Sequence, residues 1–354
     1  MKIAVGMSGG VDSAVTAALL KEEGHEVIGI HLRLYKDQGE QAKNWLDRSC
    51  CKIGLAKHVV NRLGIPLEIF DVQEAFQSSV IANFAEEYEK GRTPNPCIIC
   101  NEKIKFGTLI EKGFSLGADA VATGHYAKIV FEEKTQSYQL FKPKDTAKDQ
   151  TYFLYRLGQR QLPHILFPLS EFEKEAIYRI AEELDFPYED VLESQEVCFV
   201  NQGDYRLFLK ETKKSSAAKG EFVSMTGNHI GNHEGVPYYT VGQRRGLGVA
   251  TGKRQYVIQI NPADNRIILG DENDLLKREA ILSDLSWVSG SPPDPSLDYA
   301  IKIRYRAREV QGRILLERDS RIRIIFHQPQ KGISPGQSAV LYLGDKVLGG
   351  GIIQ

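Results

Sequence analysis

Gly6-Met7-Ser8-Gly9-Gly10-Val11-Asp12-Ser13 stands near the start of the chain, between a short apolar segment and an alanine-rich one. Residues 2–7 have the pattern of a buried strand, and residues 14–20 have that of a helix. Glycines let the backbone approach a phosphate closely, and the free N–H groups of a helix N-terminus attract negative charge. We therefore expect a phosphate-binding loop between the first strand and the first helix.

The expected loop differs from a Walker loop because no lysine precedes its final serine. Without that point charge, the loop favours ATP held by its pyrophosphate half. This geometry suits attack at the α-phosphorus, which gives an adenylated intermediate and pyrophosphate. Asp12 is available to support Mg²⁺ or to order the loop.

Strand-like and helix-like segments alternate over the first two hundred residues. β-type segments such as 26–32 and 118–126 are separated by helical patterns such as 52–63. This order predicts an α/β fold with a doubly wound parallel sheet, whose ligands lie at the carboxyl ends of the strands. Residues 8–12, 31–32 and 123–125 stand at those ends.

The residue pattern changes after Gly220, where short β-type runs are separated by Gly, Pro, Asn and Asp. Such runs predict an all-β tail built as a small barrel. We expect a nucleotide-binding catalytic domain over residues 1–205, a small β-rich central domain over 206–273 and a C-terminal β-barrel-like domain over 274–354.

The composition of the 354 residues, 42% apolar and 26% charged, is typical of a globular protein. No run of about 18 apolar residues exists, so we expect no membrane span, and the first residues do not have the pattern of a signal peptide. The net charge of −1 gives no global attraction to nucleic acid. Five cysteines, an odd number, favour the reducing cytoplasm over a disulfide scaffold.

Three cysteines stand in contexts that permit chemistry: Cys97 and Cys100 in a proline-punctuated loop, and Cys198. A thiolate near a helix start or a cation can act as a nucleophile or carry a persulfide. The three thiols are also candidate ligands for three corners of a [4Fe–4S] cluster, whereas a structural zinc lacks an evident fourth ligand. The remaining alternative is packing in the core, which is our interpretation of Cys50 and Cys51.

Several segments make the chain similar to the tRNA-specific 2-thiouridylase family of the N-type ATP pyrophosphatases. In family order they are residues 6–13, 91–96, 100–101, 105–106, 122–126, 148–154, 194–199 and 239–248. The resemblance implies that ATP adenylates the 2-carbonyl oxygen of the wobble uridine in certain tRNAs. A cysteine persulfide then delivers sulfur, and AMP and pyrophosphate are released.

The resemblance also implies roles for individual residues. Cys198 would carry the persulfide, charged by an upstream sulfur relay or a cysteine desulfurase. Cys100 would attack that persulfide to release sulfide, or form a disulfide with Cys198 as sulfur is transferred. Many relatives carry an aspartate where this chain has Cys97, which leaves the acid/base residue open and raises the cluster hypothesis. The implied ATP site is Gly6, Met7, Ser8, Gly9, Gly10, Val11, Asp12, Ser13, Leu32 and Gly124.

The implied tRNA contacts are Asn95, Pro96, Cys97, His125, Lys148, Asp149, Gln150, Tyr305, Arg306 and Gln337. Independently of the resemblance, residues 301–331 hold nine basic and three acidic side chains, a local net charge of +6. Arg304, Arg306 and Arg308 alternate, so a strand there would place all three on one face. A basic face beside an aromatic residue favours contact with RNA.

Two alternatives remain open from the sequence. One is an ATP-pyrophosphatase ligase that amidates a small carboxylate through its adenylate. The other is a non-catalytic nucleotide or iron–sulfur sensor that binds RNA. The first leaves the three cysteines and the basic segment without a role, and the second predicts ATP binding without tRNA-dependent release of pyrophosphate.

Overall fold

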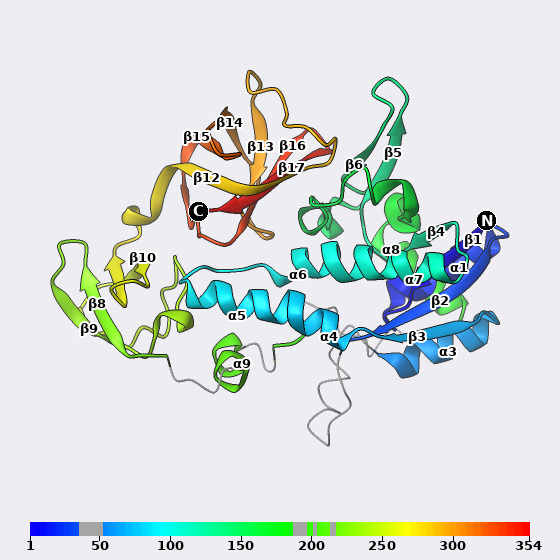
Figure 1. The fold of residues 1–354 in the computed structure, drawn as a ribbon, viewed down its shortest axis with the longest axis horizontal. Coiled ribbons are helices and arrows are strands. Elements are labelled where there is room, and N and C mark those ends of the chain that lie inside the picture. The colour runs from blue at the N-terminus through cyan, green and yellow to red at the C-terminus, as the bar shows by residue number, and fades with distance from the viewer. Residues whose placement is uncertain (35–51, 187–196, 201–203, 213–216) are drawn as a thin grey trace.

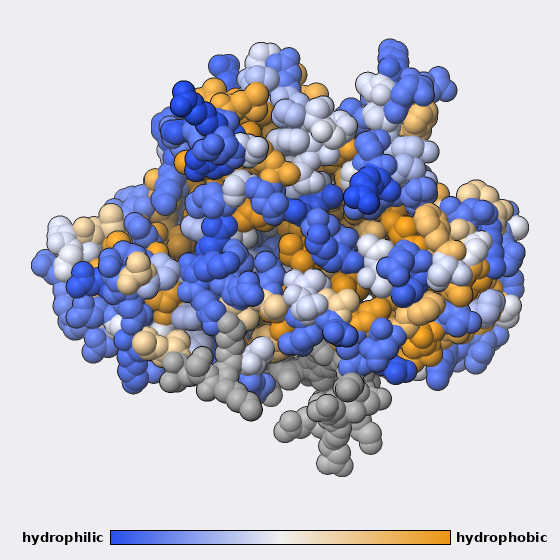
Figure 2. All heavy atoms as spheres, in the orientation of Figure 1, coloured by the Kyte–Doolittle hydropathy of each residue, from blue (hydrophilic) through white to orange (hydrophobic). Residues whose placement is uncertain are grey.

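The computed structural model describes residues 1–34, 52–186, 197–200, 204–212 and 217–354. Figure 1 shows an α/β part that carries the N-terminus, a β-barrel that carries the C-terminus, and a small β-rich part beside two long helical rows. Figure 2 shows the molecule from the same side, and hydrophilic residues cover most of this face. None of the helices in the described ranges is long and apolar enough to cross a membrane.

The α/β part is built on a parallel sheet in the order β3-β2-β1-β4-β7. Its strands are β1 (Lys2–Gly6), β2 (Glu26–Arg33), β3 (Leu67–Asp71), β4 (Ala120–Ala122) and β7 (Ile165–Leu166). The strand order reverses direction between β1 and β4, so the loops that follow these two strands diverge and leave a crevice for a ligand. The prediction of a doubly wound parallel sheet is confirmed.

Helices cover both faces of this sheet. They are α1 (Val11–Glu22), α3 (Ile53–Leu63), α7 (Leu109–Ser115) and α8 (Lys174–Glu183). Helix α1 packs against α3 and α8, and α7 packs against β1, β2 and β4. Ile3, Ala4 and Val5 of β1 are fully buried between these layers. Burial of one such aliphatic side chain contributes about 1.5–3 kcal/mol, so β1 is held firmly under the loop that follows it.

Two helical rows run side by side across the molecule (Figure 1). One consists of α4 (Gln73–Phe76), the π-helical segment η1 (Gln77–Ile81) and α5 (Ala82–Glu89); the other consists of α6 (Pro96–Ile99), the π-helical segment η2 (Cys100–Thr108) and α7. Segments η1 and η2 contact each other. π-Helical turns occur frequently at functional sites, and η2 begins at Cys100.

The central part pairs β8 (Gly220–Ser224), β9 (His229–His233), β10 (Tyr256–Asn261) and β11 (Arg266–Gly270) in the order β10-β11-β8-β9. Helix α9 (Tyr205–Thr212) precedes this sheet in the chain. Short 3-10 turns complete the described helices: η3 (Thr146–Lys148), η4 (Thr151–Phe153), η5 (Leu162–His164), η6 (Pro168–Glu171), η8 (Val236–Tyr238) and η9 (Asn273–Leu275).

Six antiparallel strands form the C-terminal barrel. They are β12 (Leu276–Trp287), β13 (Tyr299–Lys302), β14 (Val310–Leu316), β15 (Ile322–Lys331), β16 (Ser338–Leu343) and β17 (Lys346–Ile353). Strand β12 pairs with both β15 and β17, which closes the sheet and confirms the predicted barrel.

A hairpin from the N-terminal part extends the barrel sheet. Strands β5 (Lys128–Glu132) and β6 (Ser137–Phe141) form this hairpin, and β6 pairs with β17 through Lys346 and Val347. Backbone hydrogen bonds therefore join the barrel to the α/β part, which the sequence analysis did not predict.

Candidate active site

The loop between β1 and α1 has the geometry of an anion cradle. Gly9 has a φ of +84°, and a Cβ there would lie 2.3 Å from the carbonyl oxygen of Lys52, so only glycine fits. Gly10 is the N-cap of α1 and supplies no capping side chain, which leaves the first N–H groups of the helix for a ligand. The Ser13 hydroxyl donates to the Gly10 carbonyl at 2.8 Å and braces the turn.

The ends of β2 and β4 lie against this loop, as expected for a nucleotide site. A Cβ on Gly124 would lie 2.6 Å from the carbonyl carbon of Asp12, so the two loops touch through their backbones. On the β2 side, Nδ1 of the buried His31 is 2.8 Å from the carbonyl oxygen of Met7. Leu32 follows His31 and packs against two apolar clusters.

Asp12 takes part in a half-buried ion pair that the sequence analysis missed. Its Oδ1 accepts hydrogen bonds from Nζ of Lys174 at 2.7 Å and from the hydroxyl of Tyr126 at 2.9 Å. Lys174 is 4% exposed, and its ammonium group lies over the rings of Tyr126 and Tyr178. Burial, followed by the charge of Asp12, raises the pKa of Tyr126, so this hydroxyl stays protonated and donates. The network orders the phosphate loop.

The lysine that the loop itself lacks is thus supplied from the first turn of α8, 162 positions along the chain. No local pattern marks Lys174, because its partner Asp12 is distant in sequence. A solvent-exposed lysine at a helix start is common, and only its burial in the structure singles it out.

The segment that carries Cys97 and Cys100 begins with a capped helix. Oδ1 of Asn95 accepts a hydrogen bond from the Cys97 N–H at 3.2 Å, and Pro96 occupies the first helical turn. Asn95 and Pro96, which the resemblance implied as tRNA contacts, therefore also fix the start of α6. Cys97 is partly exposed.

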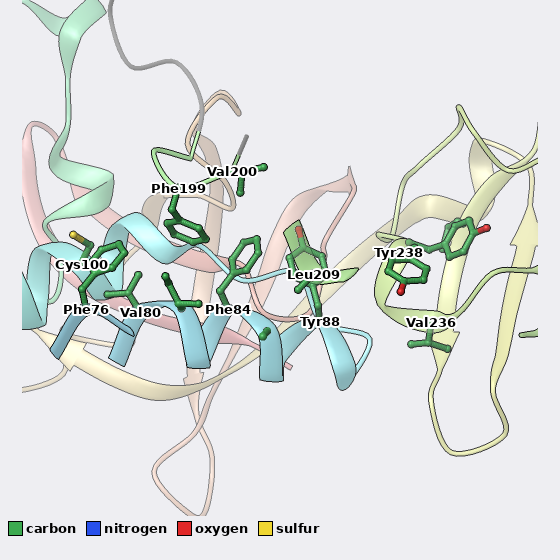
Figure 3. Close-up of a cluster of buried hydrophobic side chains, with 14 of the residues drawn as sticks. Phe76, Val80, Phe84, Tyr88, Cys100, Phe199, Val200, Leu209, Val236 and Tyr238 are labelled. Atoms are coloured by element: carbon green, nitrogen blue, oxygen red, sulfur yellow. The ribbon is translucent and has the colours of Figure 1, made fainter. Parts of the chain in front are cut away.

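Cys100 and Cys198 meet the same apolar cluster. Cys100 is 7% exposed and lies beside Phe76, with Phe199 close by in the same cluster (Figure 3). Cys198 is partly buried and packs against this cluster from a segment nearly 100 residues away. Neither cysteine forms a disulfide in this structure, and the same holds for Cys97. Apolar surroundings disfavour the thiolate, so a reactive thiol at this site needs a cation or a helix start to activate it.

Among the described residues, no three His, Cys, Asp or Glu side chains are arranged to hold a metal ion. Cys97, Cys100 and Cys198 are all described, and they do not form a ligand set for a [4Fe–4S] cluster in this structure. We therefore assign no step to such a cluster. Cys50 and Cys51 lie outside the described residues.

His125 stands at the end of β4 between two aromatic rings, Phe106 at 5.4 Å and Phe167 at 6.0 Å between ring centroids. Its Nδ1 is 2.8 Å from the hydroxyl of Thr123. Burial, followed by the charge of Lys105, holds the pKa of His125 well below its ordinary value. The imidazole is therefore neutral at physiological pH and can accept or donate a hydrogen bond without carrying charge.

Several residues that the resemblance implied as tRNA contacts also hold the structure together. Asp149 is buried and accepts from both the N–H and the hydroxyl of Thr151, at 2.8 and 2.6 Å. Oε1 of Gln150 accepts from the Tyr126 N–H at 3.0 Å. Nε2 of Gln337, in the barrel, donates to the carbonyl oxygen of Thr93 at 2.8 Å. Lys148 is partly exposed beside them, and the tRNA contacts themselves stay predictions.

The predicted strand through Arg304, Arg306 and Arg308 is wrong. Strand β13 ends at Lys302, and the chain then turns, with the Ala307 N–H donating to the Arg304 carbonyl. The turn lets Tyr305 pack on Phe153, with ring centroids 4.3 Å apart. Tertiary packing of this aromatic residue therefore overrides the local alternation. The three arginines are exposed nonetheless.

Arg156 connects the active-site helix row to the barrel. Its Nε is 2.8 Å from Oε2 of Glu102, two residues after Cys100. Its Nη1 is 2.9 Å from Oδ2 of Asp284 in β12. The Arg156 side chain is only 12% exposed, and its pKa is raised chiefly by the hydrogen bond to Asp284, against the effect of burial. It stays charged, and this pairing ties the domains together next to the cysteines.

We predict that Arg156→Ala lowers the free energy of unfolding by about 2–3 kcal/mol, because it removes the closer partner of the half-buried Glu102, at 2.8 Å, and leaves only the exposed Lys103 at 3.5 Å. Urea-induced unfolding followed by fluorescence measures the change. The matched control is Arg160→Ala, which removes an exposed arginine four residues along the chain and should shift stability by no more than about 0.5 kcal/mol. Equal stability of the two variants would show that the bridge contributes nothing.

Comparisons with known proteins identify the family. A profile described as "tRNA methyl transferase HUP domain" matches residues 1–202, a "tRNA methyl transferase PRC-barrel domain" matches 206–271, and an "Aminomethyltransferase beta-barrel domain" matches 277–353. A protein of Acetivibrio thermocellus named tRNA-specific 2-thiouridylase MnmA is 44% identical over 100% of this chain and 99% of its own length. The chain belongs to the tRNA-specific 2-thiouridylase family.

Further relatives carry the same name over the whole chain. The MnmA 1 protein of Caldanaerobacter subterraneus is 44% identical, and the MnmA protein of Clostridioides difficile is 43% identical, each over 100% of this chain and 98% of the relative. The resemblance stated from the sequence motifs is thereby confirmed, and members of this family are sulfurtransferases by name. The family membership spans all three structural parts.

Proposed function

We propose that the protein is an ATP-dependent sulfurtransferase that converts the wobble uridine of tRNA to 2-thiouridine. The observation that carries this proposal is the path from the phosphate loop to the cysteines. The helix row that contains Cys100 continues into α7, where Cδ2 of Leu109 would lie only 3.0 Å from a Cβ on Gly6, at the start of the loop. The row α6–η2–α7 thus carries Cys100 and also packs against the start of the phosphate loop.

In the first step, the uridine 2-carbonyl oxygen attacks the α-phosphorus of ATP and pyrophosphate leaves. Residues 6–13 would hold the pyrophosphate half through backbone N–H groups, with Leu32 and Gly124 beside the nucleotide. The Asp12–Lys174 pair keeps that loop in place. Mg²⁺ would accompany the phosphates and neutralise charge on them.

In the second step, the terminal sulfur of a Cys198 persulfide attacks C2 of the adenylated uridine, and AMP leaves with the former carbonyl oxygen. The Cys100 thiolate then attacks Sγ of Cys198, so that the transferred sulfur stays on C2 and a Cys100–Cys198 disulfide forms. A thiol reductant must reopen that disulfide before the next turnover. The location of both thiols at one apolar cluster supports this pairing.

The neutral His125 would stand near the target base and accept or donate a proton there. Cys97 occupies the position where many relatives are expected to carry an acid. A cysteine desulfurase or sulfur relay would charge Cys198. Cysteines that form no disulfide and a tRNA substrate are compatible with the reducing cytoplasm, which we propose as the location.

The profile descriptions mention methyl transfer, whereas the relatives are named for thiolation. Thiolation explains more of this chain, because it uses an adenylating phosphate loop and two cysteines that border one apolar cluster. A small-molecule ligase would use the loop and leave the thiols without a role.

The test combines purified protein, Mg-ATP, a persulfide donor and unmodified tRNA, with 2-thiouridine quantified by nucleoside mass spectrometry. We expect thiolated tRNA and one pyrophosphate for each sulfur transferred. Release of pyrophosphate in the absence of tRNA, without any thiolation, would replace the proposal with a small-molecule ligase. ATP binding without turnover would replace it with a sensor.

Arg304→Ala/Arg306→Ala is expected to weaken tRNA binding about tenfold and to reduce its dependence on salt, because two exposed cations are lost beside Tyr305. ATP affinity should not change. Filter binding over a salt series measures the first effect and isothermal titration the second. Wild-type affinity for tRNA in this variant would refute the role of this turn.

A further inference from the structure

An open groove of about 710 Å³ lies in the central part of the molecule, lined by none of the residues assigned above to ATP, sulfur transfer or tRNA. Its walls are residues 204–206, where α9 begins, and residues 243–246, in the loop that follows η8. Three arginines and one aspartate are among the lining residues, so the groove has a positive charge that favours an anionic ligand.

Three guanidinium groups face one carboxylate in this groove. Arg206 forms a two-pronged ion pair with Asp204, with Nε–Oδ1 at 3.0 Å and Nη2–Oδ2 at 3.1 Å. Arg244 and Arg245 are exposed, and their guanidinium groups form no hydrogen bond or ion pair with any residue in the described ranges. Arg244 also acts on the carboxylate of Glu272, whose pKa is lowered chiefly by its hydrogen bond to Lys331. The lining therefore carries a net charge of +2.

The loop that presents the two arginines is held rigidly by its backbone. Gly242 and Gly246 have φ values of +88° and +75°, which favour glycine at both ends of the turn. The Gly242 N–H donates to the carbonyl of Val257, and the Val257 N–H donates to that of Gln243, at 2.8 and 2.9 Å. Nε2 of Gln243 donates to the Arg245 carbonyl at 3.0 Å. A ligand would not need to order this loop, which favours binding.

The groove is also anchored to the catalytic helices. Tyr205 stacks on Tyr88 at the end of α5, with ring centroids 4.5 Å apart and 17° between planes. Tyr88 and Cys100 belong to one apolar cluster, which extends along α5 toward Tyr238 (Figure 3). Leu247, which directly follows the groove residues, is buried in the same cluster. The positions of the groove and the reactive thiols are therefore coupled through packed side chains.

We propose that this groove binds consecutive backbone phosphates of the tRNA while its target uridine occupies the active site. The inference rests on the proposed function. Guanidinium forks match phosphate oxygens in pairs, and an open site of about 710 Å³ is larger than one small ion requires. Tyr205 and the glycine-held loop set the distance between this contact and the cysteines.

The decisive variant is R244A/R245A in the full chain, with tRNA binding followed from about 50 to 200 mM KCl. Loss of about two phosphate contacts should weaken binding about 10–30-fold and reduce the slope of log K against log salt by about 1.5. Thiolation should show a raised KM for tRNA with little change in kcat. R244K/R245K keeps the charge without the fork, so it should retain most of the slope and only part of the affinity.

Arg266→Ala is the matched control, because Arg266 is an exposed arginine of the same central part that pairs with Glu221 and does not line the groove. It should bind tRNA as the wild type does, and both variants should match the wild-type melting temperature. If R244A/R245A binds tRNA with the affinity and salt dependence of the wild type, while the wild type thiolates tRNA, the groove does not bind tRNA and the proposed function stands. A wild type that neither binds nor thiolates tRNA would overturn both.

A free anion shares the chemistry of a backbone phosphate, so inorganic phosphate and pyrophosphate are titrated calorimetrically in parallel. Weak or absent binding of both, together with the tRNA defect, supports the assignment to RNA. Binding that R244A/R245A abolishes without any tRNA defect would overturn it in favour of a free-anion site.

Discussion

Cys198→Ser is expected to abolish thiolation, with a loss of at least about 1,000-fold, because a hydroxyl cannot carry the sulfane sulfur. Cys100→Ser should fail equally at steady state, because no thiol then releases the sulfur from Cys198. The two variants differ before that point: in Cys100→Ser, Cys198 should still accept a persulfide, which intact-protein mass spectrometry detects as one added sulfur. Both substitutions nearly conserve volume at the apolar cluster, and tRNA-dependent pyrophosphate release should survive in both.

Cys97→Ser distinguishes the persulfide mechanism from a mechanism that requires an iron–sulfur cluster. Because the three thiols do not form a ligand set, thiolation by aerobically purified Cys97→Ser should stay within about tenfold of the wild type. Cys97→Asp should be equally active, or more so if an acid near the base aids proton transfer. Loss of all activity in Cys97→Ser, with iron in the wild type alone, would refute the persulfide mechanism and restore the cluster.

Local sequence signals predicted the parallel sheet, the phosphate loop and the closed barrel. The glycines at 9 and 10 indicated a close approach of the backbone to a phosphate. The alternation of strands and helices predicted the parallel topology. These features depend on neighbours in the sequence. The structure confirms the fold because the local preferences and the global arrangement agree.

Features that depend on distant partners could not be predicted in this way. The turn at Tyr305 exists because Phe153 lies beneath it, and the hairpin β5–β6 reaches β17 across two hundred residues. The basic residues of the turn were found from their charge, but their conformation was not. Burial of Lys174 follows from the packing of α8 on α1, which no pattern in either helix shows.

Lys174→Met is expected to slow tRNA-dependent pyrophosphate release about 100-fold. The ammonium at 2.7 Å balances the charge of Asp12 under the phosphate loop, and methionine keeps the length of the side chain without that charge. An uncompensated negative charge about 5 Å from another costs about 3 kcal/mol at an effective dielectric constant of about 20, close to a factor of 100 in rate. The charge would also oppose the pyrophosphate, so the KM for ATP should rise. The matched control is Lys144→Met, at an exposed lysine close to α8.

A double variant shows whether Lys174 acts through Asp12. If the harm comes from the unpaired carboxylate, Asp12→Asn/Lys174→Met should release pyrophosphate faster than Lys174→Met alone, since neither charge remains. If Lys174 contacts the phosphates directly, the double variant should be no faster than the single one. The network of Asp12, Lys174 and Tyr126 would then explain how a phosphate loop without its own lysine keeps a fixed shape. The Lys174 ammonium comes from α8, and it acts on the aspartate of the loop.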